Sequence, residues 1–185
     1  MGKTYDQIDD KLEAFIEAQK MFFVATAPAG TGGHVNLSPK GYDSFAILGP
    51  KKVAWLDLGG SGIETLAHLK ENGRITIMFC AFEGRALILR LYGQGDAVQF
   101  DDPRFPDLLK HFPSFDKARA IVTVDLTRIQ DSCGWGVPFM DFREERDQLK
   151  RFADNPKMNA DQWAESFYNE NAMSIDGLKG VERPQ

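Results

Sequence analysis

Polar residues and glycines in the first half of the chain have the composition of an anion-binding site. Asn36, Ser38 and Lys40 alternate along one short segment, and a glycine-rich turn that contains Ser61 leads into a helix-like sequence at Thr65. The free backbone N–H groups at the start of a helix, two hydroxyls and a nearby ammonium group can together bind a phosphate. The other interpretation is an ordinary capped helix that follows a flexible glycine loop.

The motifs of the common hydrolases, nucleotidases and metalloenzymes do not occur in the sequence. It has no GxxxxGK followed by Ser or Thr, no HExxH, no GxSxG, no strand-loop GxGxxG and no His or Cys pair with metal-ligand spacing. We interpret His34, His68 and His111 as surface or packing residues. Cys80 lies in an apolar strand and is predicted to be buried, whereas Cys133 is predicted to be more exposed. The sequence predicts no metal site and identifies no catalytic residue.

Two helices in the first half are predicted from caps and from the spacing of apolar residues. A capping box at Thr4 and helical spacing beyond it predict a helix over residues 5–19. Ser61 offers an N-cap to a second, short helix that runs to about Glu71 and ends at Gly73.

The remaining apolar segments are typical of antiparallel strands joined by turns. They lie at residues 22–27, 35–38, 45–48, 53–57, 74–82, 86–95 and 120–129. The fold class that we predict is therefore mainly β with flanking helices. Its architecture is a small six-stranded antiparallel split β-barrel with an N-terminal helix, one crossing helix and a C-terminal helical tail.

A change of composition at Asp141 divides the chain into two parts. We predict a barrel domain over residues 1–140 and a C-terminal helical extension over residues 141–185 that packs on the barrel or on a partner subunit. Charged residues dominate the start of this extension, and a solvated helical face is the simplest interpretation of them. Asn159 caps a later helix that carries three aromatic residues, Trp163, Phe167 and Tyr168.

Composition and charge indicate which kinds of partner and which cellular compartment to expect for this protein. The chain has 185 residues, of which 43% are hydrophobic and 26% charged, which is ordinary for a globular protein. Its net charge of −5 argues against nucleic acid as a partner. Two cysteines do not make a disulfide framework, and no signal peptide or membrane span is visible. We therefore expect a cytoplasmic protein that does not bind membranes.

Five segments in order along the chain resemble the pyridoxamine 5′-phosphate oxidase-like family of FMN-binding proteins. They are Asn36-Leu37-Ser38-Pro39-Lys40-Gly41, Trp55-Leu56-Asp57, Ser61 to Leu69, Asn72 to Phe79 and Leu89 to Gly93. The resemblance covers residues 10 to 130. It implies a six-stranded split barrel, usually a homodimer, with FMN held at the subunit interface.

Carried over residue by residue, the resemblance implies a set of cofactor-binding positions. Asn36, Leu37, Ser38 and Lys40 would line the isoalloxazine and the phosphate, Leu56 and Asp57 would contact the flavin from the next strand, and Ser61, Gly62 and Thr65 would form the phosphate turn. The oxidase pattern has Arg-Lys directly after the serine, where this chain has Gly62-Ile63. Lys40 or Arg85 must therefore supply the positive charge.

Two features of the second half of the chain bear on the flavin ring and on the substrate. Trp135 lies in a segment rich in glycine and aromatic residues, where it would stack on the flavin edge or on the partner subunit; the alternative is a core plug at the barrel end. The Arg-Leu-x-Pro-like substrate segment of the true oxidase is missing, so we expect that pyridoxamine 5′-phosphate is not the substrate.

The resemblance favours an FMN-dependent oxidoreductase that acts on an unknown small molecule. In such an enzyme the cofactor performs the redox chemistry and the protein positions it. A non-catalytic dimer that binds flavin, deazaflavin or haem is one alternative. A cofactor-free interaction protein is another.

Overall fold

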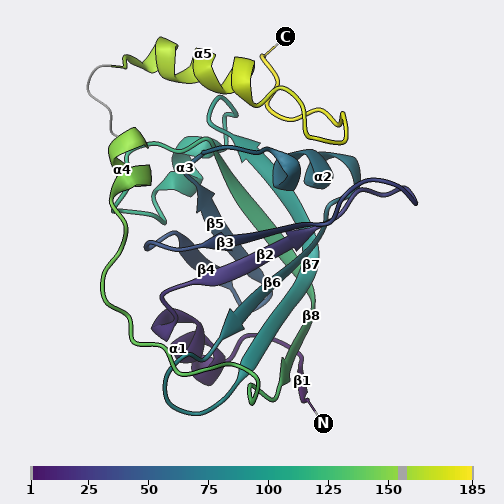
Figure 1. Cartoon of the computed structure of the whole chain (residues 1–185), viewed down its shortest axis with the longest axis vertical. Helices are drawn as coiled ribbons and strands as arrows, with labels where there is room; N and C mark the ends of the chain where they lie inside the picture. The colour runs from purple at the N-terminus through teal and green to yellow at the C-terminus, as the bar shows by residue number, and fades with distance from the viewer. Residues whose placement is uncertain (1, 154–157, 185) are drawn as a thin grey trace.

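The computed structural model describes residues 2–153 and 158–184, and its centre is one antiparallel sheet (Figure 1). The strands are β1 (Thr4–Tyr5), β2 (Phe22–Thr26), β3 (Asn36–Lys40), β4 (Phe45–Gly49), β5 (Lys52–Asp57), β6 (Arg74–Cys80), β7 (Ile88–Gln99) and β8 (Ala120–Ser132). The helices are α1 (Asp10–Ala18), α2 (Glu64–Asn72), α3 (Phe105–Leu109), α4 (Gln148–Ala153) and α5 (Ala160–Glu170).

The order of the strands confirms the predicted fold class. The sheet runs β3-β2-β6-β7-β8-β5-β4, with β1 beside β8, so β3 and β4 form its two unpaired edges. A curled sheet with two such edges is a split barrel rather than a closed one. The sheet has eight strands, because each of the seven predicted segments forms a strand (β2 to β8) and Thr4 and Tyr5 add β1 by pairing with Gln130 and Ile129 of β8.

The two predicted helix starts in the first half of the chain are both wrong. Helix α1 begins at Asp10, and its cap is Asp9, whose carboxylate accepts the Leu12 N–H at 2.9 Å. Thr4 cannot cap it, because its backbone belongs to the sheet. Helix α2 has Ile63 as its N-cap residue, without a side-chain cap, because the chain turns sharply at Gly62 and leaves Ser61 too far ahead.

Other local signals are confirmed. Helix α2 ends at Gly73, whose φ of 69° gives the left-handed conformation expected of a C-cap. Asn159 and Gln162 form the capping box of α5. The long β6–β7 hairpin forms as predicted, and Cys80 is buried while Cys133 is exposed. Helix α3 is an addition that the sequence did not predict.

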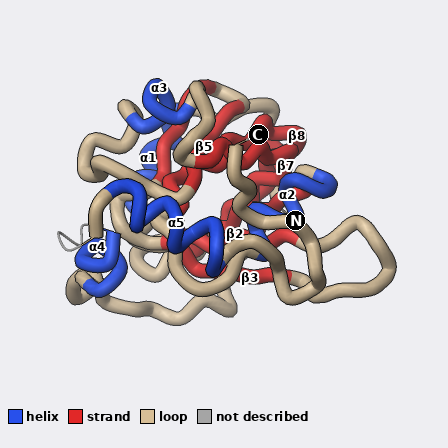
Figure 2. The backbone as a smooth tube through the Cα atoms, turned by 90° about the horizontal axis from the view of Figure 1, so that it is seen from above, coloured by secondary structure: helices blue, strands red, loops and turns tan. Residues whose placement is uncertain are grey.

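The main core fills the barrel and continues under the C-terminal extension. Trp55, Phe79 and Leu91 are fully buried inside the barrel, and Trp163 and Phe167 of α5 belong to the same cluster. Seen from above, α5 crosses the end of the barrel close to α2 (Figure 2). The extension therefore packs on the barrel of its own chain.

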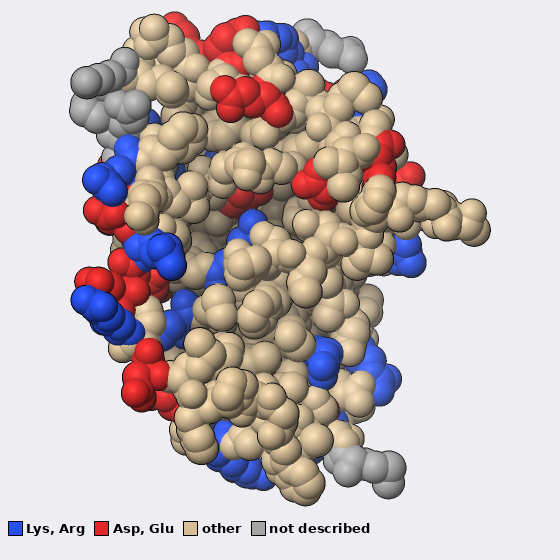
Figure 3. All heavy atoms as spheres, viewed as in Figure 1, with Lys and Arg blue, Asp and Glu red and all other residues tan. Residues whose placement is uncertain are grey.

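The charged segment at residues 141–147 is exposed and is not helical. It forms a strap that climbs the side of the barrel from the end of β8 to α4 (Figure 1). Charged side chains of both signs gather along this edge of the molecule (Figure 3), and they include the exposed pair of Arg151 and Asp147. Only α4 matches the predicted solvated helix, because the strap has few apolar residues with which to pack.

Candidate functional site

Strand β3 presents its polar residues on one face. The side chains of Asn36, Ser38 and Lys40 are half-buried, whereas those of Leu37 and Pro39 point to solvent. This alternation follows from the two-residue period of a strand. Among the described strands, β3 pairs with β2 alone, so alternate backbone groups of this edge strand face away from the sheet. A bound molecule can use these groups.

A hydrogen bond joins β3 to the start of α2. The Asn36 Nδ2 atom donates to the Thr65 Oγ1 atom at 2.8 Å and lies 3.4 Å from the Thr26 hydroxyl. The Thr26 Oγ1 atom in turn lies 3.0 Å from Nδ1 of His68. Burial lowers the pKa of His68, so this ring is neutral and acts as a packing residue of the network. Asn36 and Thr65, both predicted as site residues, are thus neighbours.

The four residues 59–62, which we call the glycine turn, have a conformation that requires glycine. Gly59, Gly60 and Gly62 have φ values of 93°, 121° and 89°. Ser61 is exposed on this turn. Above the turn lies a hollow of about 610 Å³, which residues 60–62 line together with Phe152 and Glu170. The space over the turn is therefore open enough for a ligand.

A buried ion pair lies beneath the glycine turn. The Arg119 Nη2 atom is 2.9 Å from the Asp57 Oδ2 atom, and the two side chains are 5% and 3% exposed. Burial opposes ionisation of Asp57, but the Arg119 guanidinium and the more distant Lys40 ammonium outweigh it and hold the pKa of this carboxyl below its usual value.

The structure uses Leu56 and Asp57 within the fold. The Leu56 side chain is buried in the core under α3, and its N–H donates to the Ser44 carbonyl at 2.8 Å. The Asp57 carboxylate is bound to Arg119. Direct contact of these two residues with a flavin stays a prediction. Sequence reasoning missed Arg119, since nothing in the sequence around it points to a partner 62 residues away.

Arg85 and Trp135 lie at the other end of the barrel. Arg85 is in the β6–β7 loop, where its charge acts on Tyr5, and Gly134 packs against Leu87 of the same loop. The seven residues of β6 separate this loop from the α2 end, a distance of about 20 Å. Trp135 is 88% exposed, so the core-plug interpretation is wrong. Within one chain these two residues are not brought to the glycine turn.

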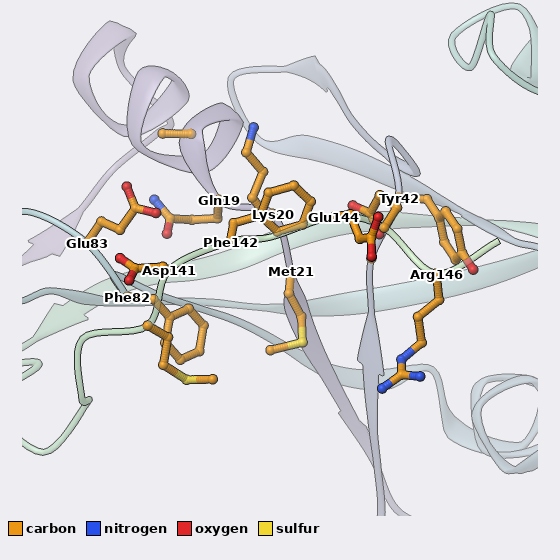
Figure 4. A pocket seen from close by; sticks show the side chains of 14 residues that line it. Gln19, Lys20, Met21, Tyr42, Phe82, Glu83, Asp141, Phe142, Glu144 and Arg146 are labelled. Atoms are coloured by element: carbon orange, nitrogen blue, oxygen red, sulfur yellow. The ribbon is translucent and has the colours of Figure 1, made fainter.

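A second hollow, of about 440 Å³, lies just beyond Lys40 (Figure 4). The strap covers it, with Phe142 next to Lys20 and Glu144 next to Tyr42. The Lys20 Nζ atom is 5.9 Å from the centre of the Phe142 ring. The walls are largely apolar, and carboxylates lie at the rim. Gly41 and Tyr42, which directly follow β3, line this hollow.

Two further properties of the described residues bear on chemistry. Across residues 2–153 and 158–184, no three His, Cys, Asp or Glu side chains are grouped in a way that could hold a metal ion. In the same ranges, every helix is too short or too polar to cross a membrane.

Comparison with known proteins assigns the fold to a family. Residues 8–133, more than half of the chain, match the family described as pyridoxamine 5′-phosphate oxidase. The chain is 38% identical to the pyridoxamine 5′-phosphate oxidase family protein ustO of Aspergillus flavus, over 96% of this chain and 77% of that protein.

Two solved structures share the fold. A variant of HupZ from Group A Streptococcus has a TM-score of 0.56 and 22% identity, over 68% of this chain and 99% of that one. A putative pyridoxamine 5′-phosphate oxidase from Lactobacillus delbrueckii has a TM-score of 0.52 and 14% identity, over 69% and 98% of the two chains. The split barrel, the match over residues 8–133 and the identity to ustO together show that the chain belongs to the pyridoxamine 5′-phosphate oxidase family.

Proposed function

We propose that this chain binds FMN between β3 and the glycine turn and is an FMN-dependent oxidoreductase with a small-molecule substrate. The observation that carries the proposal is the juxtaposition of two segments that are distant in sequence. The hydrogen bond between Asn36 and Thr65 holds the polar face of β3 against the start of α2. Membership of the family makes a flavin the ligand that this juxtaposition favours.

The residues at the turn fit the phosphate of FMN. Ser61 is exposed there, and an added Cβ at Gly60 would meet no atom within 4 Å, so the turn faces open space. The N–H groups at the start of α2 and their helix dipole favour an anion. Lys40, on the polar face of β3, supplies the positive charge. Glu64, whose carboxylate lies beside Gly62, and Glu170, which lines the same hollow, oppose an anion there.

The ring of the flavin would lie along β3. The unpaired backbone groups of this edge strand suit the polar edge of the isoalloxazine, and the hollow beyond Lys40 has apolar walls that suit a substrate. Bound FMN would supply the electron transfer. The chain's own residues would bind and orient it, and the strap would limit access of water to the hollow.

We include a homodimer in the proposal. Leu37 is 64% exposed on the edge strand β3, and Trp135 and Phe139 are 88% and 83% exposed before the strap. Large apolar side chains exposed in such number are typical of an interface. In a dimer, Arg85 and Trp135 of one subunit could also contact a flavin bound at β3 of the other subunit. Within one chain they do not reach this site.

The visible absorption spectrum of freshly purified protein, with mass spectrometry of the released ligand, tests the proposal. We expect flavin absorption and the mass of FMN. If the protein is purified without a cofactor, titration with FMN is expected to quench flavin fluorescence. A haem spectrum, a deazaflavin mass or failure to bind FMN would contradict the proposal.

A further inference from the structure

We propose that Arg119 and Asn171 form a clamp that holds the glycine turn in the conformation that binds phosphate. Because Asn171 belongs to the C-terminal extension, the extension then helps to shape the cofactor site. This inference rests on the proposed function, because the phosphate of FMN is the ligand that the turn would bind. Arg119 acts here as a positioning residue, since it lies beneath the turn and does not face the hollow.

The first step is the contact between Arg119 and the turn. The Nη1 atom of Arg119 donates to the carbonyl oxygens of Gly60 at 3.3 Å and of Gly62 at 3.0 Å. A trans peptide unit is planar and directs its C=O and its N–H to opposite sides. With both carbonyls turned inward to one guanidinium, the N–H groups of Ser61 and Ile63 are directed outward. Arg119 thereby selects the orientation of two peptide units that an anion would contact.

The second step is the orientation of the guanidinium itself. Asp57 binds the Nη2 atom with both carboxylate oxygens, at 2.9 and 3.2 Å. Asn171 accepts from the Nη1 atom through its Oδ1 atom at 2.8 Å. Each of the three side chains is buried. Because the guanidinium is planar and its donors have fixed directions, two partners at different nitrogens fix its plane.

The third step is the position of Asn171 in the extension. It is the C-cap residue of α5, where its N–H donates to the Phe167 carbonyl at 2.9 Å, and its own carbonyl accepts the Val181 N–H at 2.8 Å. Both sides of its backbone are therefore tied to the extension. The Phe167 ring lies 5.8 Å from the Arg119 guanidinium and fills the space where Gly59 would carry a Cβ. The extension thus contacts the turn and its clamp through two residues.

The test compares Asn171→Ala with the matched variant Glu165→Gln. Glu165 also lies on α5, but it pairs with Arg183 at the surface and does not contact the turn. We expect Asn171→Ala to weaken the binding of FMN about tenfold. The binding of riboflavin, which lacks the phosphate, should stay unchanged. In the protein without flavin, the backbone amide NMR signals of Ser61 and Ile63 should shift, whereas those of β8 should stay unchanged. Glu165→Gln should change neither quantity.

Arg119→Lys is the second variant, in case Asn171→Ala folds poorly. A lysine keeps the charge beside Asp57, but its single ammonium cannot hold both carbonyls and Asn171 in one plane. We expect the same loss of preference for FMN over riboflavin. Equal weakening of FMN and riboflavin binding, or unchanged amide signals of Ser61 and Ile63, would overturn the clamp. If the unaltered protein does not bind FMN, the proposed function fails, while the amide signals of the turn still test the clamp.

Discussion

Asp57 at the end of β5 and Arg119 just before β8 form a buried ion pair, with 2.9 Å between the Oδ2 and Nη2 atoms. The pair ties the two neighbouring strands together at the point where the chain enters the glycine turn. A buried charge without its partner is costly, whereas the complete pair with its hydrogen bonds is tolerated. The arrangement therefore makes both the fold and the shape of the turn depend on the charge of one carboxylate.

Replacement of this carboxylate should destabilise the protein. We expect Asp57→Asn to lower the free energy of unfolding by about 3 kcal/mol at pH 7, because the Arg119 charge is then buried without a counter-ion. Urea unfolding measures this. The matched control is Asp125→Asn, which removes an exposed partner of Lys52 and should change stability by less than about 1 kcal/mol. An equal effect of the two substitutions would contradict this account.

The same pair predicts a dependence of stability on pH. The pKa of Asp57 is lower in the folded protein than its ordinary value of 3.8. Its contribution is therefore present above pH 3.8 and is lost as the pH falls through the lower folded pKa. The difference in unfolding free energy between the unaltered protein and Asp57→Asn should shrink below pH 3.8. A difference that stays constant down to pH 2 would show that the carboxylate charge is not the cause.

Lys40 is expected to provide the main positive charge for the phosphate. A charge-assisted bond contributes about 1.5 to 3 kcal/mol, so Lys40→Ala should weaken FMN binding about ten- to a hundredfold. Ser61→Ala should weaken FMN binding less, and neither substitution should change the binding of riboflavin. Titrations by flavin fluorescence measure both ligands, with Lys52→Ala as a control on another strand. If Lys40→Ala weakens riboflavin binding as much as FMN binding, Lys40 contacts the ring or supports the fold.

Removal of the Glu64 charge should have the opposite effect. Its carboxylate lies beside Gly62 and accepts the Ile175 N–H at 3.3 Å. Glu64→Gln keeps an acceptor oxygen there but removes a charge that repels phosphate, so FMN should bind about three- to tenfold more tightly at low salt. High salt should reduce the gain. Glu71→Gln, at the far end of α2, is the control. Unchanged or weaker FMN binding by Glu64→Gln would place the phosphate elsewhere.

Pyridoxamine 5′-phosphate is not expected to be a substrate. The C-terminal residues that follow α5 fold back over α2, where Val181 is buried. This part of the chain lacks the substrate segment of the true oxidase. An oxygen-consumption assay on FMN-loaded protein should show negligible turnover of pyridoxamine 5′-phosphate. Robust turnover would overturn this prediction.

The exposed apolar residues predict self-association. Sedimentation equilibrium at micromolar concentration should show a dimer, and Leu37→Glu on the edge strand should shift the protein toward the monomer. Lys179→Glu, on the exposed C-terminal segment, is the control and should leave the dimer intact. A folded monomer of the unaltered chain at this concentration would contradict the prediction.

Local sequence determined a large part of the fold. The alternation of Asn36, Ser38 and Lys40 predicts one polar face of a strand, and that face is what β3 presents. Gly73 ends α2, and Asn159 caps α5, as their residue types indicate. These features were predictable because each depends on interactions within a few residues of the chain.

Tertiary structure alone decided the features that depend on distant partners. Thr4 is a strand residue because β8 offers it a neighbour, and Trp135 is exposed because the chain leaves the barrel at that point. Arg119 belongs beneath the glycine turn only because Asp57 and Asn171 meet it there, 62 and 52 residues away. Hydrophobic periodicity and capping signals report the local conformation of the backbone. They do not specify which buried charges meet, because that depends on the packing of the whole sheet and its extension.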